Sequence, residues 1–98
     1  METEHMANGY TSGLTIGTTE QLAVVVPDGM LADITIQNLS ANDLYYGAQG
    51  GLSTSSGLKV VPNGSVEILA RIVPLSLVAS GASSDVRIDV EFYRKGEK

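Results

Sequence analysis

The sequence predicts an all-β protein: a small antiparallel β-sandwich, jelly-roll-like, with about six to eight short strands. Three observations support this class. Apolar and polar residues alternate with a period of two in several segments, as in strands that bury one face. Turn-forming combinations of proline, glycine and asparagine recur about every 8–12 residues. No segment keeps a helical period for more than about two turns, which excludes the crossover helices of parallel sheets.

The N-terminal part of the chain divides into an expected arm and the first strands. Residues 1–12 are polar and small without a visible period, so we expect an N-terminal arm there and a single β-sandwich domain over residues 13–98. Gln21–Val26 is a β-branched run that a strong turn signal, Pro27-Asp28-Gly29, ends. Ala32–Gln37 alternates strictly and predicts the next strand.

The middle of the chain contains shorter elements. Leu44–Tyr46 predicts a brief strand that stops at Gly47. The glycine- and serine-rich stretch Ala48–Gly57 predicts a loop, with one weak strand around Leu52–Thr54. A further short strand is expected over Leu58–Val61.

The C-terminal third begins at a second turn signal, Pro62-Asn63-Gly64. Ser65–Ile72 then alternates, with the even-numbered residues from 66 to 72 on its apolar face. Pro74 breaks any helix across this region, so Leu75–Ala79 is either a strand or a single helical turn. The final strand is the clearest, because only a strand sorts its residues onto two faces. Its apolar face holds Val86, Ile88, Val90 and Phe92, and its polar face holds Asp85, Arg87, Asp89, Glu91 and Tyr93.

Composition excludes several classes of partner. The formal net charge is −5 and the six basic residues form no patch, which argues against a nucleic-acid partner. No apolar run approaches the roughly 20 residues of a membrane span, and the N-terminus does not resemble a secretion signal, so we expect a soluble protein made in a cytoplasm. The chain has no cysteine and therefore no disulfide or thiolate site.

We find no catalytic or metal-binding pattern and expect neither an enzyme nor a cofactor. The single histidine, His5, lies in the expected arm, where it lacks the fixed geometry that acid–base catalysis needs. A serine nucleophile would need a base that no other histidine can supply. Gly50-Gly51 lacks the Gly-Lys-Ser/Thr ending and the helix of a phosphate loop.

Two groups of oxygen-bearing side chains are candidate ligand sites. Asp85, Asp89 and Glu91 project in parallel from one strand face and do not converge. The cluster of Asn38, Asn42 and Asp43 either binds calcium or makes a turn through hydrogen bonds to its own backbone, and we favour the turn. Tyr45 and Tyr46 point to opposite faces of a strand, so one is expected in the core and the other exposed, where it could anchor an interface or a sugar.

The order of the motifs resembles that of small β-sandwich proteins encoded among bacteriophage head and tail structural genes. The chain runs through ITIQNLS, LYYG, SSGLKV, VPNGSVEI, LSLVASG and DVRIDVEF, and the match covers about two thirds of its length from Ala32 onward. The resemblance carries over Gly47, Pro62 and Gly64 as turn positions. The matching segments are Ile34–Asn38, Leu44–Gly47, Gly57–Val61, Pro62–Ile68, Leu75–Gly81 and Val86–Phe92.

The resemblance implies a structural virion protein of the capsid decoration (cement) type. Such a protein is made in the bacterial cytoplasm, sits on the capsid exterior as a homotrimer, and binds and stabilises the major capsid protein shell. No nucleic acid, membrane or small-molecule substrate is expected as a partner. The arm, Met1–Ser12, is the expected contact with the shell or a neighbour. The residues expected at the interface are Met6, Tyr10, Leu39, Tyr45 and Tyr46.

Two other classes stay open at this point. The chain could be a tail or fibre module that binds a host-surface glycan, through loops such as Ala48–Gly57, or another tail protein. A small hydrolase would require a convergent set of histidine, serine and carboxylate, which the sequence does not offer.

Overall fold

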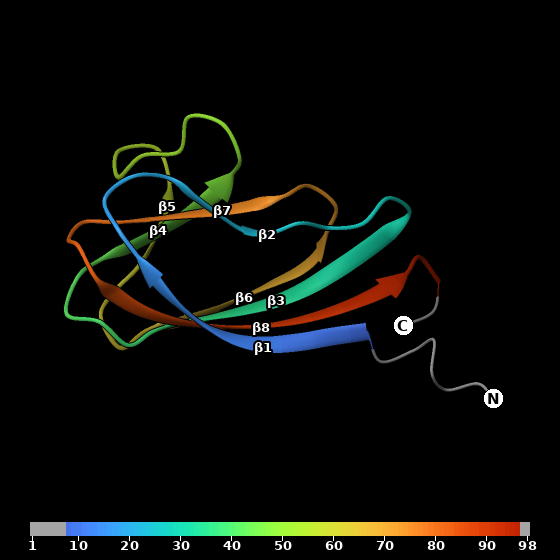
Figure 1. Cartoon of the computed structure of the whole chain (residues 1–98). Coiled ribbons are helices and arrows are strands. Elements are labelled where there is room, and N and C mark those ends of the chain that lie inside the picture. The colour runs from blue at the N-terminus through green and yellow to red at the C-terminus, as the bar shows by residue number, and fades with distance from the viewer. Residues whose placement is uncertain (1–7, 97–98) are drawn as a thin grey trace.

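A computed structural model describes residues 8–96 of the chain. These residues form eight strands and no helix, which confirms the all-β prediction, and so they contain no helix that could cross a membrane. The strands form two four-stranded antiparallel sheets: sheet A, in the order β1-β8-β3-β6, and sheet B, in the order β2-β7-β4-β5 (Figure 1). Their bounds are β1 (Asn8–Ile16), β2 (Gln21–Val24), β3 (Met30–Asn38), β4 (Leu44–Ala48), β5 (Leu58–Val60), β6 (Ser65–Arg71), β7 (Leu75–Ala79) and β8 (Ser84–Arg94).

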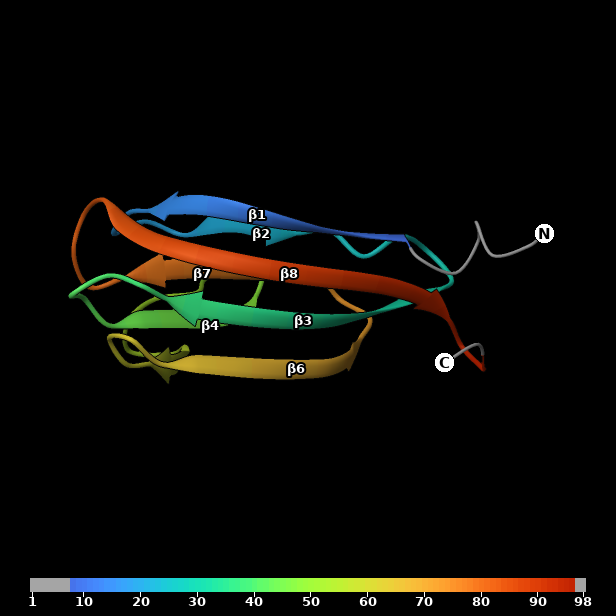
Figure 2. The same cartoon turned by 90° about the horizontal axis from the view of Figure 1, so that it is seen from below.

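The strands pair as in a jelly roll. The first strand pairs with the eighth, the second with the seventh, the third with the sixth and the fourth with the fifth. The same pairing arises when one long antiparallel hairpin folds over into two packed sheets. Figure 2 shows sheet A from outside, with the first and last described residues of the chain at the same end of the molecule.

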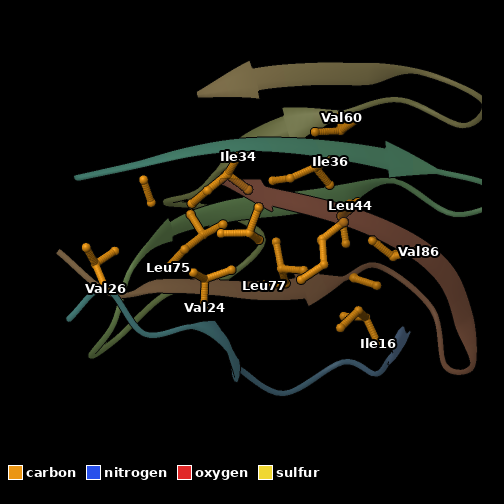
Figure 3. Packing of buried hydrophobic residues seen from close by; sticks show 14 residues of the cluster. Ile16, Val24, Val26, Ile34, Ile36, Leu44, Val60, Leu75, Leu77 and Val86 are labelled. Atoms are coloured by element: carbon orange, nitrogen blue, oxygen red, sulfur yellow. The ribbon is translucent and has the colours of Figure 1, made fainter. Parts of the chain in front are cut away.

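The two sheets enclose one apolar core. Ile34 and Ile36 of β3 and Leu75 and Leu77 of β7 all point into the space between the sheets (Figure 3). The alternation predicted for β8 is confirmed, because its apolar face lies in this core. The buried residues of the cluster are Ile16, Val24, Val26, Ala32, Ile34, Ile36, Leu44, Val60, Leu75, Leu77, Ala79, Val86, Ile88 and Val90.

The predicted turns are confirmed at both proline-containing sites. At Pro62, the amide of Gly64 donates to the carbonyl of Val61 (2.9 Å) and Asn63 has a φ of 63°. A proline followed by a residue with positive φ is the arrangement of a type II turn. At the earlier site the amide of Met30 donates to the carbonyl of Pro27 (3.1 Å). The chain therefore reverses where the sequence predicts.

The predicted alternation of β6 is wrong at its end, where the strand contains a β-bulge. The sequence places Ala70 and Ile72 on the inner face, but both are exposed. Between the partners of Ala32 and Ile34, β6 has one residue more than β3. An extra residue reverses the alternation beyond it, so the face that follows the bulge is no longer the inner one.

The buried carboxylate of Asp33 supports this bulge. It accepts hydrogen bonds from the amide of Ala70 (3.0 Å) and from the hydroxyl of Tyr93 (2.9 Å). Ala70 has a φ of 55°, in the left-handed region that disfavours residues with a Cβ. The bulge is thus held by a side chain from the neighbouring strand.

Three further predictions require correction. The arm was predicted to end at Ser12, but β1 begins at Asn8 because residues 8–16 pair continuously with β8; residues 1–7 lie outside the described part. Leu52–Thr54 is not a strand. Gly47 is not a turn residue, because β4 continues through it and pairs with Ser76 of β7.

Candidate docking surface

The polar residues considered for catalysis or metal binding do not converge in the described part of the chain. Among residues 8–96 no group of three histidine or acidic side chains could hold a metal ion. Asp85 lies 3.5 Å from the guanidinium of Arg87, and Asp89 accepts a hydrogen bond from the hydroxyl of Thr11. His5 lies outside the described residues. The outer face of β8 is therefore a polar, solvated surface.

The asparagine cluster makes a turn, as predicted. Asn38 is fully buried at the end of β3. Its Nδ2 donates to the carbonyls of Asn42 (2.8 Å) and Val60 (3.0 Å), and its Oδ1 accepts from the amide (3.0 Å) and hydroxyl (2.7 Å) of Ser40. All four hydrogen-bonding positions of the side-chain amide are used, so this group ties the β3–β4 turn to β5.

The glycine pair Gly50-Gly51, in the loop between β4 and β5, binds a carboxylate of the same chain, that of Glu20. The carboxylate of Glu20 accepts hydrogen bonds from the backbone amides of Gly50 (2.8 Å), Gly51 (3.0 Å) and Leu52 (3.2 Å). These bonds, that of Gly50 first, hold the pKa of Glu20 below its usual value. The hydroxyl of Ser76 approaches the same carboxylate and also lowers its pKa, although outside hydrogen-bond geometry.

Glu20 fixes the loop between β4 and β5 over the outer face of sheet B (Figure 1). The side chain of Leu52 fills the space above two glycines: a Cβ added at Gly47 or at Gly57 would lie 2.9 Å from it. Ser76 is fully buried although it faces away from the core. The loop therefore covers this face of the sheet, and a Cβ at position 47 would meet the side chain of Leu52 unless that side chain shifted.

Acidification should release this loop. Because the pKa of Glu20 is lower in the folded chain than its ordinary value of 4.5, the three amide bonds stabilise the fold above that pH. Their contribution is lost as the pH falls through the folded-state pKa. In an NMR titration, the amide resonances of Gly50 and Gly51 should move with a midpoint below 4.5. Glu20→Gln should abolish this titration, and a midpoint at or above 4.5 would contradict the assignment.

The predicted interface residues lie on different surfaces. These residues are Met6, Tyr10, Leu39, Tyr45 and Tyr46. Tyr10 is exposed on β1, and Leu39 is exposed in the β3–β4 turn. Tyr46 packs against the core, whereas Tyr45 lies on the outer face with the ammonium of Lys59 5.9 Å from its ring centre. Met6 lies outside the described residues.

A set of exposed aliphatic side chains gathers instead at the end of the sandwich where the described chain starts and stops. Val25 follows β2 and is 59% exposed; Ile72 follows β6 and is 67% exposed. Pairing of Val24 with Leu75 and of Ala32 with Arg71 brings the loops after β2 and β6 to this same end (Figure 1). We call this surface the apolar end, and it consists of Val25, Pro27, Met30, Ile72 and Val73.

The apolar end contains a shallow hollow of about 270 Å³. Pro27, Met30 and Ile72 contribute apolar walls, and Asp28 and Lys95 contribute charges. An apolar floor with a few charged groups at its margin is the usual anatomy of a protein–protein contact. The sequence did not reveal this surface, because the alternation of β6 assigns Ile72 to the core and only the bulge exposes it.

Comparisons with known proteins support the fold alone. No protein-family model matches the chain, and no curated protein matches it. Among solved structures, it is similar to a chain from a study of Bacillus endospore appendages, described as a novel family of disulfide-linked pili. The TM-score is 0.55 at 9% identity, covering 89% of this chain and 85% of that one. A de novo designed double-stranded β-helix gives a TM-score of 0.48 at 12% identity, covering 88% and 99%, which is too low to support a common fold.

Proposed function

We propose that this chain is a non-enzymatic structural protein of a bacteriophage virion, a capsid decoration protein that binds the major capsid protein from the capsid exterior and stabilises the shell. The resemblance of its motifs to phage structural proteins suggests the class. The observation that carries the proposal is the apolar end, where Val25, Ile72 and Val73 are exposed and Ile72 lines a hollow. Aliphatic groups gathered at one end in this way mark an interaction site.

The backbone of the apolar end is held in place before docking. Asp33 fixes the bulge that exposes Ile72, and the turn at Pro27 is closed by the amide of Met30. Such preorganisation reduces the loss of conformational entropy on association. Burying a valine or isoleucine side chain contributes about 1.5–3 kcal/mol, so a few of them at the centre of an interface supply much of its affinity.

Ile72→Asp should abolish binding to shells. The test is co-sedimentation with capsids of the encoding phage that lack this protein. A carboxylate placed in the apolar end would lose its hydration on docking, so we expect at least a hundredfold loss of affinity, on the order of 3 kcal/mol. Val61→Asp is the matched control, because Val61 is 54% exposed in the turn before β6 and outside the apolar end.

Equal binding by the Ile72 variant and the unchanged chain would refute the apolar end as the docking site. Binding to host cells or isolated glycans, without binding to shells, would refute the decoration proposal and support the tail or fibre alternative. The homotrimer implied by the resemblance is a separate prediction, and the mass in solution measures it.

A further inference from the structure

Three of the four free strand edges carry features that prevent pairing with another chain. In the described residues, sheet A ends at β1 and β6, and sheet B ends at β2 and β5. β6 contains the bulge and two charged residues, Glu67 and Arg71. β2 has four residues and an irregular register, and β5 has three residues including Lys59. Short length, charge and bulges are the usual protection of an edge strand.

β1 has none of these protections. It is nine residues long, NGYTSGLTI, with no charge and no proline. Its register with β8 is continuous from Asn8 to Ile16 without a bulge. An edge of this kind exposes a row of backbone donors and acceptors over roughly 30 Å. On β1 the carbonyls of Gly13 and Thr15 already accept hydrogen bonds from the side chains of Ser12 (3.4 Å) and Gln21 (3.2 Å), which a pairing copy would have to displace. An uncharged edge can also pair with a copy of itself without placing like charges opposite each other.

We propose that two copies of this chain pair through β1, antiparallel and about a two-fold axis at Ser12. The two A sheets then join into one eight-stranded sheet. An isologous contact of this kind closes after two copies. The unit expected in solution is therefore a dimer, instead of the trimer that the resemblance implies.

The outward residues of β1 favour this register. Gly9, Thr11, Gly13 and Thr15 alternate along the outer face. With the axis at Ser12, each outward glycine of one copy lies opposite an outward threonine of the other. With the axis at residue 11, Gly9 would instead face Gly13, and with the axis at residue 13, Thr11 would face Thr15. An open hollow of about 330 Å³ lies over Gly13, where the partner's threonine would pack.

The inward residues favour the same register. Tyr10 is 42% exposed although its partner in β8, Val90, is buried. The Tyr10 ring lies 6.2 Å from the ring of Phe92. Because β1 is the edge strand of sheet A, no further strand among the described residues covers the other side of the Tyr10 ring. With the axis at Ser12, Tyr10 lies opposite Leu14 of the second copy. An aromatic–aliphatic pair across strands stabilises such an edge.

A cysteine scan tests the pairing, since the chain has no cysteine of its own. Thr11→Cys, Ser12→Cys and Gly13→Cys are oxidised separately under non-denaturing conditions, with Ser65→Cys on the protected edge as control. A residue on the two-fold axis faces its own copy at about 4.5–5.5 Å between Cα atoms, within the range of a disulfide. We expect Ser12→Cys to form a cross-linked dimer at least tenfold faster than the other three variants.

Mass measurements on the unmodified chain complete the test. Light scattering over increasing concentration should show a mass approaching two chains, and Ser12→Lys should remain monomeric because two ammonium groups would meet at the axis. The Ser12→Lys variant should keep the circular dichroism spectrum of the unmodified chain, which shows that it folds. A stable mass of three chains, or cross-linking of Ser12→Cys no faster than the Ser65→Cys control, would overturn the proposal.

The pairing does not depend on the proposed function. It does determine how two apolar ends would be arranged relative to each other in a dimer. Because the two copies run antiparallel, their apolar ends lie at opposite extremities of the dimer. One dimer could then bridge two capsid sites. If Ile72→Asp binds shells like the unmodified chain while Ser12→Cys still cross-links rapidly, the docking proposal fails and the pairing stands. Loss of shell binding by Ile72→Asp with cross-linking of Ser12→Cys no faster than Ser65→Cys gives the reverse outcome.

Discussion

Asn38→Asp should lower the free energy of unfolding by about 4 kcal/mol, although the two side chains have nearly the same shape. The substitution replaces Nδ2, which donates to the carbonyls of Asn42 and Val60, with an oxygen. The new carboxylate would face two carbonyl oxygens inside a fully buried site. An unpaired buried charge and two lost donors together account for an effect of this size, which is a large share of the roughly 5–15 kcal/mol that stabilises a domain.

Urea denaturation followed by circular dichroism measures this effect. Gln37→Glu is the matched control, because Gln37 precedes Asn38 on the same strand, is exposed and undergoes the same amide-to-acid change. We expect the control to change stability by less than about 0.5 kcal/mol. If both variants unfold at the same urea concentration as the parent, the asparagine network does not stabilise the two sheets.

Leu77→Ala should lower the free energy of unfolding by about 3 kcal/mol. Leu77 lies at the centre of β7, fully buried, and points into the core (Figure 3). Truncation removes three carbon atoms, Cγ and its two methyl groups, and leaves a cavity that the central strands of both sheets cannot easily close. The same urea experiment measures the loss.

Leu58→Ala provides the comparison for this core truncation. Leu58 is 62% exposed on the short edge strand β5, so the same chemical change removes little buried surface there. We expect an effect below about 0.5 kcal/mol. Equal losses for Leu58→Ala and Leu77→Ala would contradict the assignment of Leu77 to the packed core.

The strands that the sequence predicts well are those that bury one face in the core. β8 is the clearest example, since its burial alternates along most of its length. The sequence predicts an arm over part of β1 because this strand lacks a regular alternation of apolar and polar residues. At the free edge of the sheet Tyr10 is exposed and Ser12 and Leu14 are half-buried, so the fold does not require large apolar residues at these positions. The partner that makes it a strand lies at the other end of the chain, beyond the reach of local patterning.

The candidate surfaces were less predictable, because each depends on contacts between distant segments. Ile72 becomes exposed through a bulge that Asp33 holds from another strand. Glu20 binds amides about thirty positions further along the chain, and no motif marks it. By contrast, the asparagine turn was predicted correctly, because Asn38 and Ser40 satisfy each other within two residues.

The pairing of the first strand with the last has a consequence for the folding rate. Asn8 lies opposite Phe92 and Ile16 opposite Ser84, so β1 cannot join the β3–β6 pair in sheet A until β8 has left the ribosome. Closing such long loops before any pairing energy is gained makes folding slow, on the scale of milliseconds to seconds. During synthesis β1 has no partner and one edge of β3 stays open until β8 emerges, so a chain truncated before Ser84 should accumulate as an aggregation-prone, unfolded species.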